Sequence, residues 1–284
     1  MTKAFPTGNR EFYLTATQGC PYLPGRRERK VFTFLGGEGA DALNAELSAR
    51  GFRRSQNIAY LPACERCSAC RPVRVLTDGF DERPWRRVLR RNQHVTRRAR
   101  PPRVTQEQFS LLRAYLDARH AEGGMTNMTV LDYAAMVEQT PVDTEVHEYR
   151  DPDGTLVACA LTDRLAVAES TKPKTEALTD RLAVAEGTKV TTGSLGPGEG
   201  GGLSMVYSFF APDAPRRSLG SYVILDHVAQ ARAAGLPAVY LGYWVEGSPK
   251  MDYKRRFAPL EVLGRDGWRP MPAATTPAPR RPAP

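Results

Sequence analysis

Three of the five cysteines in this 284-residue chain are spaced like ligands of a single metal centre. Cys64, Cys67 and Cys70 form a C-x2-C-x2-C run, and thiolates at such spacing hold zinc or an iron–sulfur cluster. In a chain without a secretion signal, clustered cysteines indicate metal binding or redox chemistry rather than disulfides. Reduced structural cysteines without a metal are the alternative. Cys159 lies in an apolar run, so we expect it to be a buried core thiol.

Nine arginines and no acidic residue lie between Arg83 and Arg103. The whole chain has 40 Lys and Arg against 31 Asp and Glu, a net charge of +9. The nine arginines of this segment therefore equal the entire excess of positive charge. Because the segment contains no acid, its arginines cannot neutralise one another through i,i+4 ion pairs. A positive field concentrated on one segment favours a polyanionic partner over a merely solvated helix face.

Hydrophobic spacing predicts a mixture of strands and helices. A capping box at Thr105–Gln108 precedes apolar residues at helical spacing. Further helices are expected near Asp41–Arg50, from Thr129 and from near Ser221. Strands are expected at Glu145–Arg150, Thr155–Leu161, Leu203–Phe210 and Ala238–Tyr243. Strands with helices packed around them make an α+β or α/β fold.

Composition divides the chain into four regions. We expect a cysteine-bearing domain at 10–80, an arginine-rich connector at 81–104, a second domain at 105–265 and a disordered proline-rich tail at 266–284. No run of about 18 apolar residues is present, and the N-terminus carries no cleavage-type signal. The expected location is therefore cytoplasmic.

One ten-residue stretch occurs twice. Ala160–Glu169 recurs unchanged at Ala177–Glu186, and a glycine-rich tract at 193–202 follows the second copy. Two copies are too few for a solenoid. Only one copy can occupy a given place in a sheet, so we expect the other to be a loop within a hairpin connection.

Several unusual stretches follow one another in order between about residues 10 and 265. They are Gly19–Arg26, Cys64–Val75, Arg90–Asn92, Leu203–Phe210, Arg217–Gly220, Tyr240–Trp244 and Lys250–Lys254. Together these stretches resemble the aminoacyl-tRNA–protein transferases, in particular the bacterial aspartate/glutamate leucyltransferases. The repeated stretch and the glycine tract depart from the family's pattern, in which a short hairpin would be expected.

The resemblance implies an N-terminal cysteine-bearing domain and a C-terminal domain of the GCN5-related N-acetyltransferase (GNAT) type. It also implies transfer of leucine from leucyl-tRNA to proteins that begin with Asp or Glu, which creates a degradation signal (the N-end rule). The partners would be leucyl-tRNA and such protein N-termini, with no membrane. An arginyl-tRNA donor is the nearest alternative, and a metal-stabilised RNA-binding module without catalysis is the alternative from another class.

The implied reaction is aminolysis of an activated ester. An α-amino group has a pKa of about 7.7–8.0, so the enzyme must mainly supply positioning, an oxyanion contact and a proton route. No cofactor is needed for the transfer, and no Ser-His-Asp or Cys-His arrangement is evident. Tyrosine hydroxyls can relay a proton, and lysines can hold an acidic side chain or the tRNA end. The catalytic candidates are Tyr207, Ser208, Lys250, Tyr253 and Lys254. Packed tyrosines and solvated lysines are the alternative.

The turn Arg217–Tyr222 resembles the R-x-x-G turn with which acetyltransferases of the GNAT type hold the coenzyme A pyrophosphate. Tyr222 stands where such turns carry a small residue, so we expect a loop for the 3′ end of tRNA instead. The candidate tRNA-binding residues are Arg86, Arg87, Arg90, Arg91, Arg217 and Gly220. The resemblance also adds Cys20 to the three-cysteine run, which gives four thiolates for a structural zinc or iron–sulfur cluster.

Overall fold

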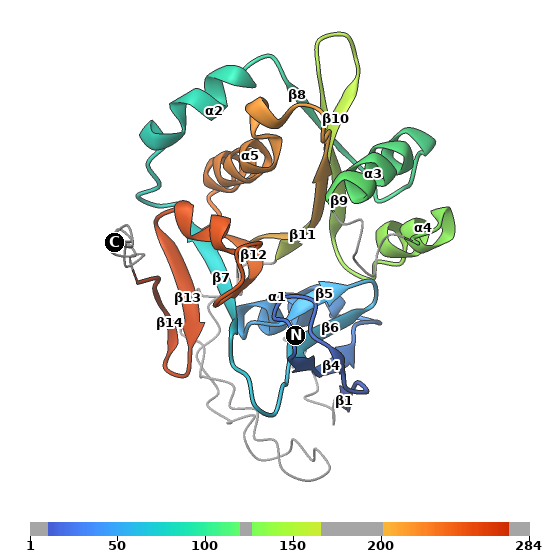
Figure 1. Ribbon diagram of the computed structural model, residues 1–284, viewed down its shortest axis with the longest axis vertical. Helices are drawn as coiled ribbons and strands as arrows, with labels where there is room; N and C mark the ends of the chain where they lie inside the picture. Colours follow the sequence, from blue (N-terminus) through green and yellow to red (C-terminus); the bar gives the residue numbers. More distant parts are fainter. Residues whose placement is uncertain (1–10, 120–126, 166–200, 273–284) are drawn as a thin grey trace, which may run out of the picture.

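The computed structural model describes residues 11–119, 127–165 and 201–272. Its largest element is an eight-stranded sheet in the order β14-β13-β7-β12-β11-β10-β9-β8 (Figure 1). The strands are β7 (Cys70–Leu76), β8 (Thr96–Arg100), β9 (Thr144–Arg150), β10 (Leu156–Leu165), β11 (Gly202–Phe210), β12 (Ala238–Val245), β13 (Leu260–Gly264) and β14 (Gly267–Pro270). Strands β11 and β12 are parallel neighbours, whereas the other described pairs of this sheet are antiparallel. The mixed α and β character expected from the sequence is confirmed.

A smaller antiparallel sheet is built from the N-terminal residues. Its order is β1-β4-β6-β5, and the strands are β1 (Tyr13–Leu14), β4 (Lys30–Phe34), β5 (Arg53–Ser55) and β6 (Ile58–Pro62). Helix α1 (Ala40–Ala49) covers one face, where its leucines pack with Val31 and Ala59. The helix expected near Asp41–Arg50 is thus confirmed. Two further short strands, β2 (Gln18–Gly19) and β3 (Arg27–Glu28), form a ribbon of their own.

Helices cover both faces of the large sheet. Helix α5 (Leu219–Ala233) packs on one face together with the short α2 (Arg86–Arg91), whereas α3 (Gln106–Arg119) and α4 (Val130–Glu138) lie on the other (Figure 1). Strand β10 is buried from both sides: Ala158 and Ala160 belong to the core under α5, and Cys159 and Leu161 to the core under α3. Cys159 is therefore a buried core residue, as predicted. No helix within the described ranges is long and apolar enough to cross a membrane.

Local sequence signals explain where these helices begin. Thr105 and Gln108 form the predicted capping box, with N–H···O distances of 3.1 and 3.2 Å. Thr129 and Asp132 form a second one at the start of α4. Helix α5 begins at Leu219, two residues earlier than expected.

The boundaries expected at residues 80 and 104 do not coincide with breaks in the sheet. Strand β7 lies between β12 and β13, where Val75 pairs with Val239 on one side and Leu260 on the other. The arginine-rich segment contributes β8, which pairs with β9 at the sheet edge. Residues assigned to the cysteine-bearing region and to the connector are therefore part of the large sheet.

Residues 267–270 form β14, so these residues do not belong to the disordered tail expected from residue 266. The tail was expected to be disordered because of its many prolines. Trp268 nevertheless fixes the strand, because its indole N–H donates to the Ala49 carbonyl at 2.8 Å. The remaining tail from 273 lies outside the described residues.

The first copy of the repeated stretch enters β10 and continues to Leu165, which pairs with Gly202 of β11. The second copy at 177–186 lies outside the described residues. The first copy therefore forms part of the sheet. Strand β10 (Leu156–Leu165) also ends later than the predicted strand Thr155–Leu161.

Candidate active site

The two parallel strands β11 and β12 separate after a very short contact. They pair only at Leu203–Val239 and Ser204–Tyr240. Beyond these pairs β11 stays with β10 as far as Phe210, and β12 stays with β7 as far as Val245. We call the point where β11 and β12 part the strand fork. Backbone carbonyls of β11 beyond this point have no partner on β12 and need another donor.

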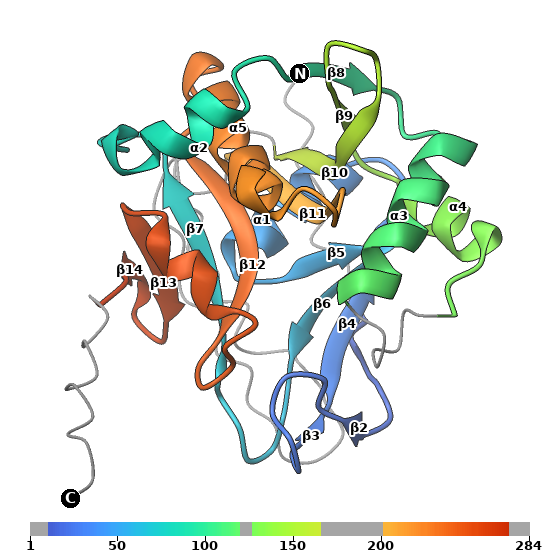
Figure 2. The same cartoon turned by 45° about the horizontal axis from the view of Figure 1, so that its top comes forward.

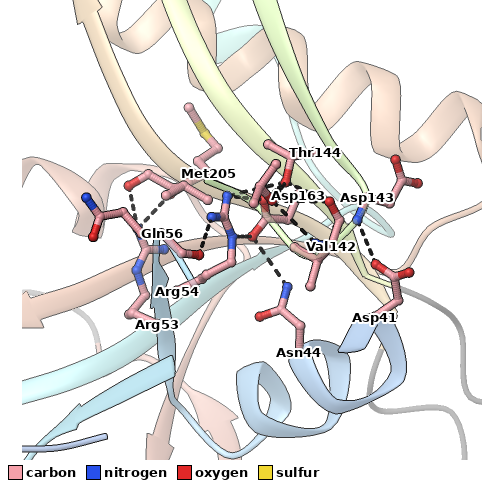
Figure 3. Close-up of polar contacts among 12 residues, drawn as sticks. Asp41, Asn44, Arg53, Arg54, Gln56, Val142, Asp143, Thr144, Asp163 and Met205 are labelled. Atoms are coloured by element: carbon pink, nitrogen blue, oxygen red, sulfur yellow. Dashed lines mark hydrogen bonds and ion pairs between the residues drawn. The ribbon is translucent and has the colours of Figure 1, made fainter. Parts of the chain in front are cut away.

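Arg53 of the small sheet supplies that donor. Its Nη2 donates to the Met205 carbonyl at 2.7 Å and to the Val206 carbonyl at 3.0 Å (Figure 3). On the β12 side, a methyl group built on Gly242 would lie 2.7 Å from the Arg53 Cζ. Gly242 thus leaves the space that the guanidinium fills. The other terminal nitrogen, Nη1, is buried without a hydrogen-bond partner in the described structure.

Lys254 brings a second cation to the same place. It lies in the 3-10 helix Asp252–Arg256, is 5% exposed, and its Nζ donates to the Tyr243 carbonyl of β12 at 2.6 Å. Burial lowers the pKa of Lys254 to about 7, and the positive charge of Arg53 contributes to this lowering. Two cations from distant parts of the chain therefore meet beside Gly242 and Tyr243.

Tyr253 also lies at the fork. The residue is 44% exposed, yet burial of the hydroxyl raises its pKa to about 12. Tyr115 adds to this rise, and the positive charge of Arg53 opposes it. The hydroxyl accordingly stays protonated at neutral pH and can donate a hydrogen bond.

The other three catalytic candidates lie less centrally. Tyr207 packs beside the core under α3, its ring 6.2 Å from that of Phe209, and burial raises the pKa of its hydroxyl. Ser208 is half-buried on β11 opposite Ala160. Lys250 is exposed. Of the five candidates, the structure brings Tyr253 and Lys254 together with Arg53.

A second arginine fixes the position of Arg53. Arg54, the next residue of β5, forms a buried ion pair with Asp163 of β10 (Figure 3). Thr144 and Asn44 donate to the same carboxylate at 2.8 and 3.3 Å. Because neighbouring residues of a strand point to opposite faces, a fixed Arg54 holds Arg53 toward the fork.

The sequence analysis did not single out Arg53, Arg54 or Asp163. One signal was available for Asp163, which stands inside an apolar run. Buried carboxylates are nearly always paired, so this aspartate required a cationic partner. Nothing in the sequence indicates that the partner lies 109 residues earlier.

The predicted turn at Arg217–Tyr222 has structural roles in this arrangement. The two terminal nitrogens of Arg217 both contact Asp151 at 2.7 Å, and its Nε donates to Asn92. A methyl group at Gly220 would lie 2.6 Å from the Phe210 ring, so glycine is needed where α5 packs on β11. Binding of tRNA by Arg217 and Gly220 stays a prediction.

The arginine-rich segment divides into two parts. On β8, Arg97 pairs with Asp226 and Arg100 with Glu148, so acids from elsewhere in the fold neutralise part of its charge. On α2 the arginine side chains are largely exposed, and none of them forms an ion pair within the described residues. These are Arg86, Arg87, Arg90 and Arg91. Figure 2 shows α2 next to α5 near the edge of the molecule.

The four cysteines lie close together. The pKa of Cys70 is raised to about 12, mainly by burial and in part by electrostatic contributions from Cys64, Cys20 and Cys67. Yet no group of three His, Cys, Asp or Glu side chains in the described ranges is arranged to hold a metal ion. The donor type and number fit a zinc or iron–sulfur centre; the present geometry is not that of a closed ligand set. A cavity of about 680 Å³ lies beside Cys64 and Cys67.

Comparison with known proteins defines the class. A model of the arginine-tRNA-protein transferase N terminus matches residues 18–88, and a model of the C terminus matches residues 107–172 and 199–264. The chain belongs to the arginine-tRNA-protein transferase family, which confirms the resemblance drawn from its sequence. Residues 173–198, which include the second copy of the repeat, are not covered by either match.

Its close relatives carry a more specific name. The aspartate/glutamate leucyltransferase of Parvibaculum lavamentivorans is 50% identical, over 96% of this chain and 100% of the relative. Those of Azorhizobium caulinodans and Hyphomonas neptunium are 51% and 50% identical, over 91% and 92% of this chain and 94% and 91% of the relatives. A solved structure, L-PGS from Bacillus licheniformis, aligns with a TM-score of 0.35 and 12% identity over 75% of this chain and 52% of that chain, which is too low to support an argument about fold.

Proposed function

We propose that this protein transfers leucine from leucyl-tRNA to the N-terminal Asp or Glu of target proteins in the cytoplasm, where the added leucine serves as a degradation signal. The observation that carries this proposal is the identity of about 50% to aspartate/glutamate leucyltransferases over nearly the whole chain. The fork supports it, because two parallel strands that part beside a crossover helix, α5, are the arrangement expected of a GNAT-type acyltransferase domain.

The reaction needs few chemical groups beyond correct placement. The neutral α-amine of the acceptor attacks the ester carbonyl, the C–N bond forms, and the C–O bond to the ribose breaks. The amine loses a proton and the departing ribose oxygen gains one. Tyr253 is suited to donate a proton to the departing ribose oxygen, because a hydroxyl with a pKa of about 12 remains protonated at neutral pH.

Charge favours the α2 side of the molecule as the surface for tRNA. The exposed arginines of α2 can contact the phosphate backbone, which supplies affinity without sequence selection. A coenzyme A donor fits less well, since Arg217 is occupied by Asp151 and Tyr222 stands at the helix start.

The four cysteines would hold a structural zinc ion or iron–sulfur cluster, and such a centre would stabilise the loops around the small sheet. No step of the transfer is assigned to it. Reduced cysteines without a metal remain the alternative, and metal analysis of the purified protein distinguishes the two.

The direct test incubates the protein with peptides that begin with Asp or Glu and a mixture of charged tRNAs. Mass spectrometry is expected to show the mass of one leucine on the peptide N-terminus. Addition of arginine would establish the alternative donor. Binding of tRNA without any modified peptide would establish a non-catalytic RNA-binding module.

A further inference from the structure

Two cations at the strand fork have no anionic partner in the part of the chain that the structure describes. Neither Arg53 nor Lys254 forms an ion pair with any carboxylate of these residues. Arg53 bonds two backbone carbonyls of β11, and Lys254 bonds one of β12. After burial, the charge of Arg53 lowers the pKa of Lys254, whereas Cys70 raises it.

Such an arrangement is unfavourable for the stability of the fold. Buried charges are normally paired, because desolvation of an unpaired cation costs several kcal/mol. Here the two like charges also repel each other. A site of this kind is expected where a ligand supplies the missing negative charge.

The geometry around Arg53 leaves one terminal nitrogen, Nη1, as a donor for an anionic ligand. Its Nη2 is fixed by the Met205 and Val206 carbonyls, and Nη1 is a buried donor without a partner among the described residues. Gly242, with a φ of +76°, has no side chain that would displace the guanidinium: a methyl group there would lie 2.7 Å from Cζ. A guanidinium held in this way is oriented before the ligand arrives.

We propose that Arg53 and Lys254 bind the side-chain carboxylate of the acceptor protein's first residue and so select Asp and Glu. This proposal rests on the proposed function and names the residues that determine its acceptor specificity. With the carboxylate bound at the fork, the α-amine of the same residue lies a few bonds away, within reach of an ester held between β11 and β12.

The alternative role for these cations is stabilisation of the oxyanion formed during aminolysis. An oxyanion exists only transiently, whereas Arg53 is always charged and Lys254 is partly protonated at neutral pH. A carboxylate that stays charged throughout the reaction compensates them better. The phosphates of tRNA are a poorer match, because Lys254 is buried and the exposed arginines lie on α2.

The test compares four peptides that differ only in their first residue: Asp, Asn, Glu or Gln. Transfer is measured with leucyl-tRNA for the wild type, Arg53→Gln and Lys254→Met. We expect kcat/KM for the Asp and Glu peptides to fall on the order of 100-fold in each variant, because a buried charge loses its partner. The values for the Asn and Gln peptides should stay within about threefold, and the KM for leucyl-tRNA should not change.

Arg53→Lys keeps a charge and should recover part of the preference for acidic peptides. Arg265→Gln, at the exposed turn between β13 and β14, is the matched control and should behave as wild type. An equal loss on all four peptides would overturn the proposal in favour of an oxyanion role, and an unchanged Asp-to-Asn ratio would overturn it outright.

A binding measurement separates this proposal from the proposed function. Calorimetry with the Asp and Asn peptides in the absence of tRNA is expected to show tighter binding of the Asp peptide, and Arg53→Gln should abolish the difference. If the wild type modifies no peptide, the proposed function fails, while this titration still decides the role of Arg53. Equal affinity of the wild type for both peptides would contradict the carboxylate site.

Discussion

Arg54 and Asp163 form a two-point ion pair between the small and the large sheet, with Nε–Oδ2 and Nη2–Oδ1 distances of 2.6 Å each. Their side chains are 1% and 0% exposed. Thr144 donates to the same carboxylate, so the charge is compensated by more than one group. This pair connects β5 to β10 and thereby holds Arg53 at the strand fork.

Replacing Asp163 by Asn should strongly destabilise the protein. The variant leaves the Arg54 charge buried without its partner, and losses of about 3–5 kcal/mol are typical of such changes. Urea denaturation followed by circular dichroism measures the difference. The neighbouring pair Arg164–Asp143 is the control: at 3.9 Å and about half exposed, its loss in Arg164→Gln should cost less than about 1 kcal/mol. Similar effects of the two variants would contradict this account.

Lys254→Met should stabilise the protein while it impairs transfer to acidic acceptors. Burial lowers the pKa of Lys254 from 10.5 to about 7, so below pH 7 the folded protein carries the full penalty of a buried charge. Between pH 7 and 10.5 the unfolded chain binds a proton that the folded chain does not, so this penalty falls as pH rises. The gain in thermal midpoint should therefore be largest near pH 6 and smaller near pH 9. A gain independent of pH would argue against a charged Lys254.

Gly242→Ala should displace the Arg53 guanidinium. Its methyl group would lie 2.7 Å from both Cζ and Nε of Arg53, so we expect a loss of about 1–3 kcal/mol in stability and a lower Asp-to-Asn ratio in transfer. Gly235→Ala is the matched control, because Gly235 has a similar φ of +66° but no atom within 4 Å of the added methyl. Equal changes in the acceptor ratio would show that backbone strain alone is responsible.

Charge reversal on α2 should weaken tRNA binding in a salt-dependent way. For Arg86→Glu, Arg87→Glu and Arg90→Glu, the slope of log K against log salt should decrease by about 1 for each arginine–phosphate ion pair that the substitution removes. Filter binding at several salt concentrations measures the slope. Arg265→Glu is the control: it changes the net charge as much as each α2 substitution does, but it lies at the turn between β13 and β14. A slope unchanged in the α2 variants would exclude this helix from the tRNA interface.

Deletion of residues 173–198 should leave folding and transfer intact. The family match ends at 172 and resumes at 199, and β10 and β11 remain paired as far as Leu165 and Gly202. Antiparallel strands need only a short connection, and residues 166–172 and 199–201 would remain to form it. Thermal denaturation and the peptide assay test the variant; loss of either property would assign the segment a role of its own.

The elements with strong local signals were predictable. The capping box at Thr105, the strand at Leu203–Phe210 and the helix that follows it all have periodic or capping patterns confined to a few residues. Strand β7 was not assigned to the large sheet, because its neighbours β12 and β13 come more than 160 residues later. Strand β14 was missed because the proline content of the tail outweighed the contribution of Trp268.

The site was only partly predictable for the same reason. Lys254 and Tyr253 stood out by type and by position after the last apolar strand. Arg53 was not singled out, since its role depends on β11 residues 152 and 153 positions away and on the space left by Gly242. Local sequence carries no information about where two strands part.

The central position of β7 has a consequence for biosynthesis. This strand is made early, but both of its hydrogen-bonding edges are satisfied only by β12 and β13, near the other end of the polypeptide. While the ribosome is still extending the chain, β7 has two unpaired edges, and fragments that end before β12 would expose these edges to self-association. The two regions recognised by the family models therefore complete the large sheet together, once β12 and β13 have been synthesised.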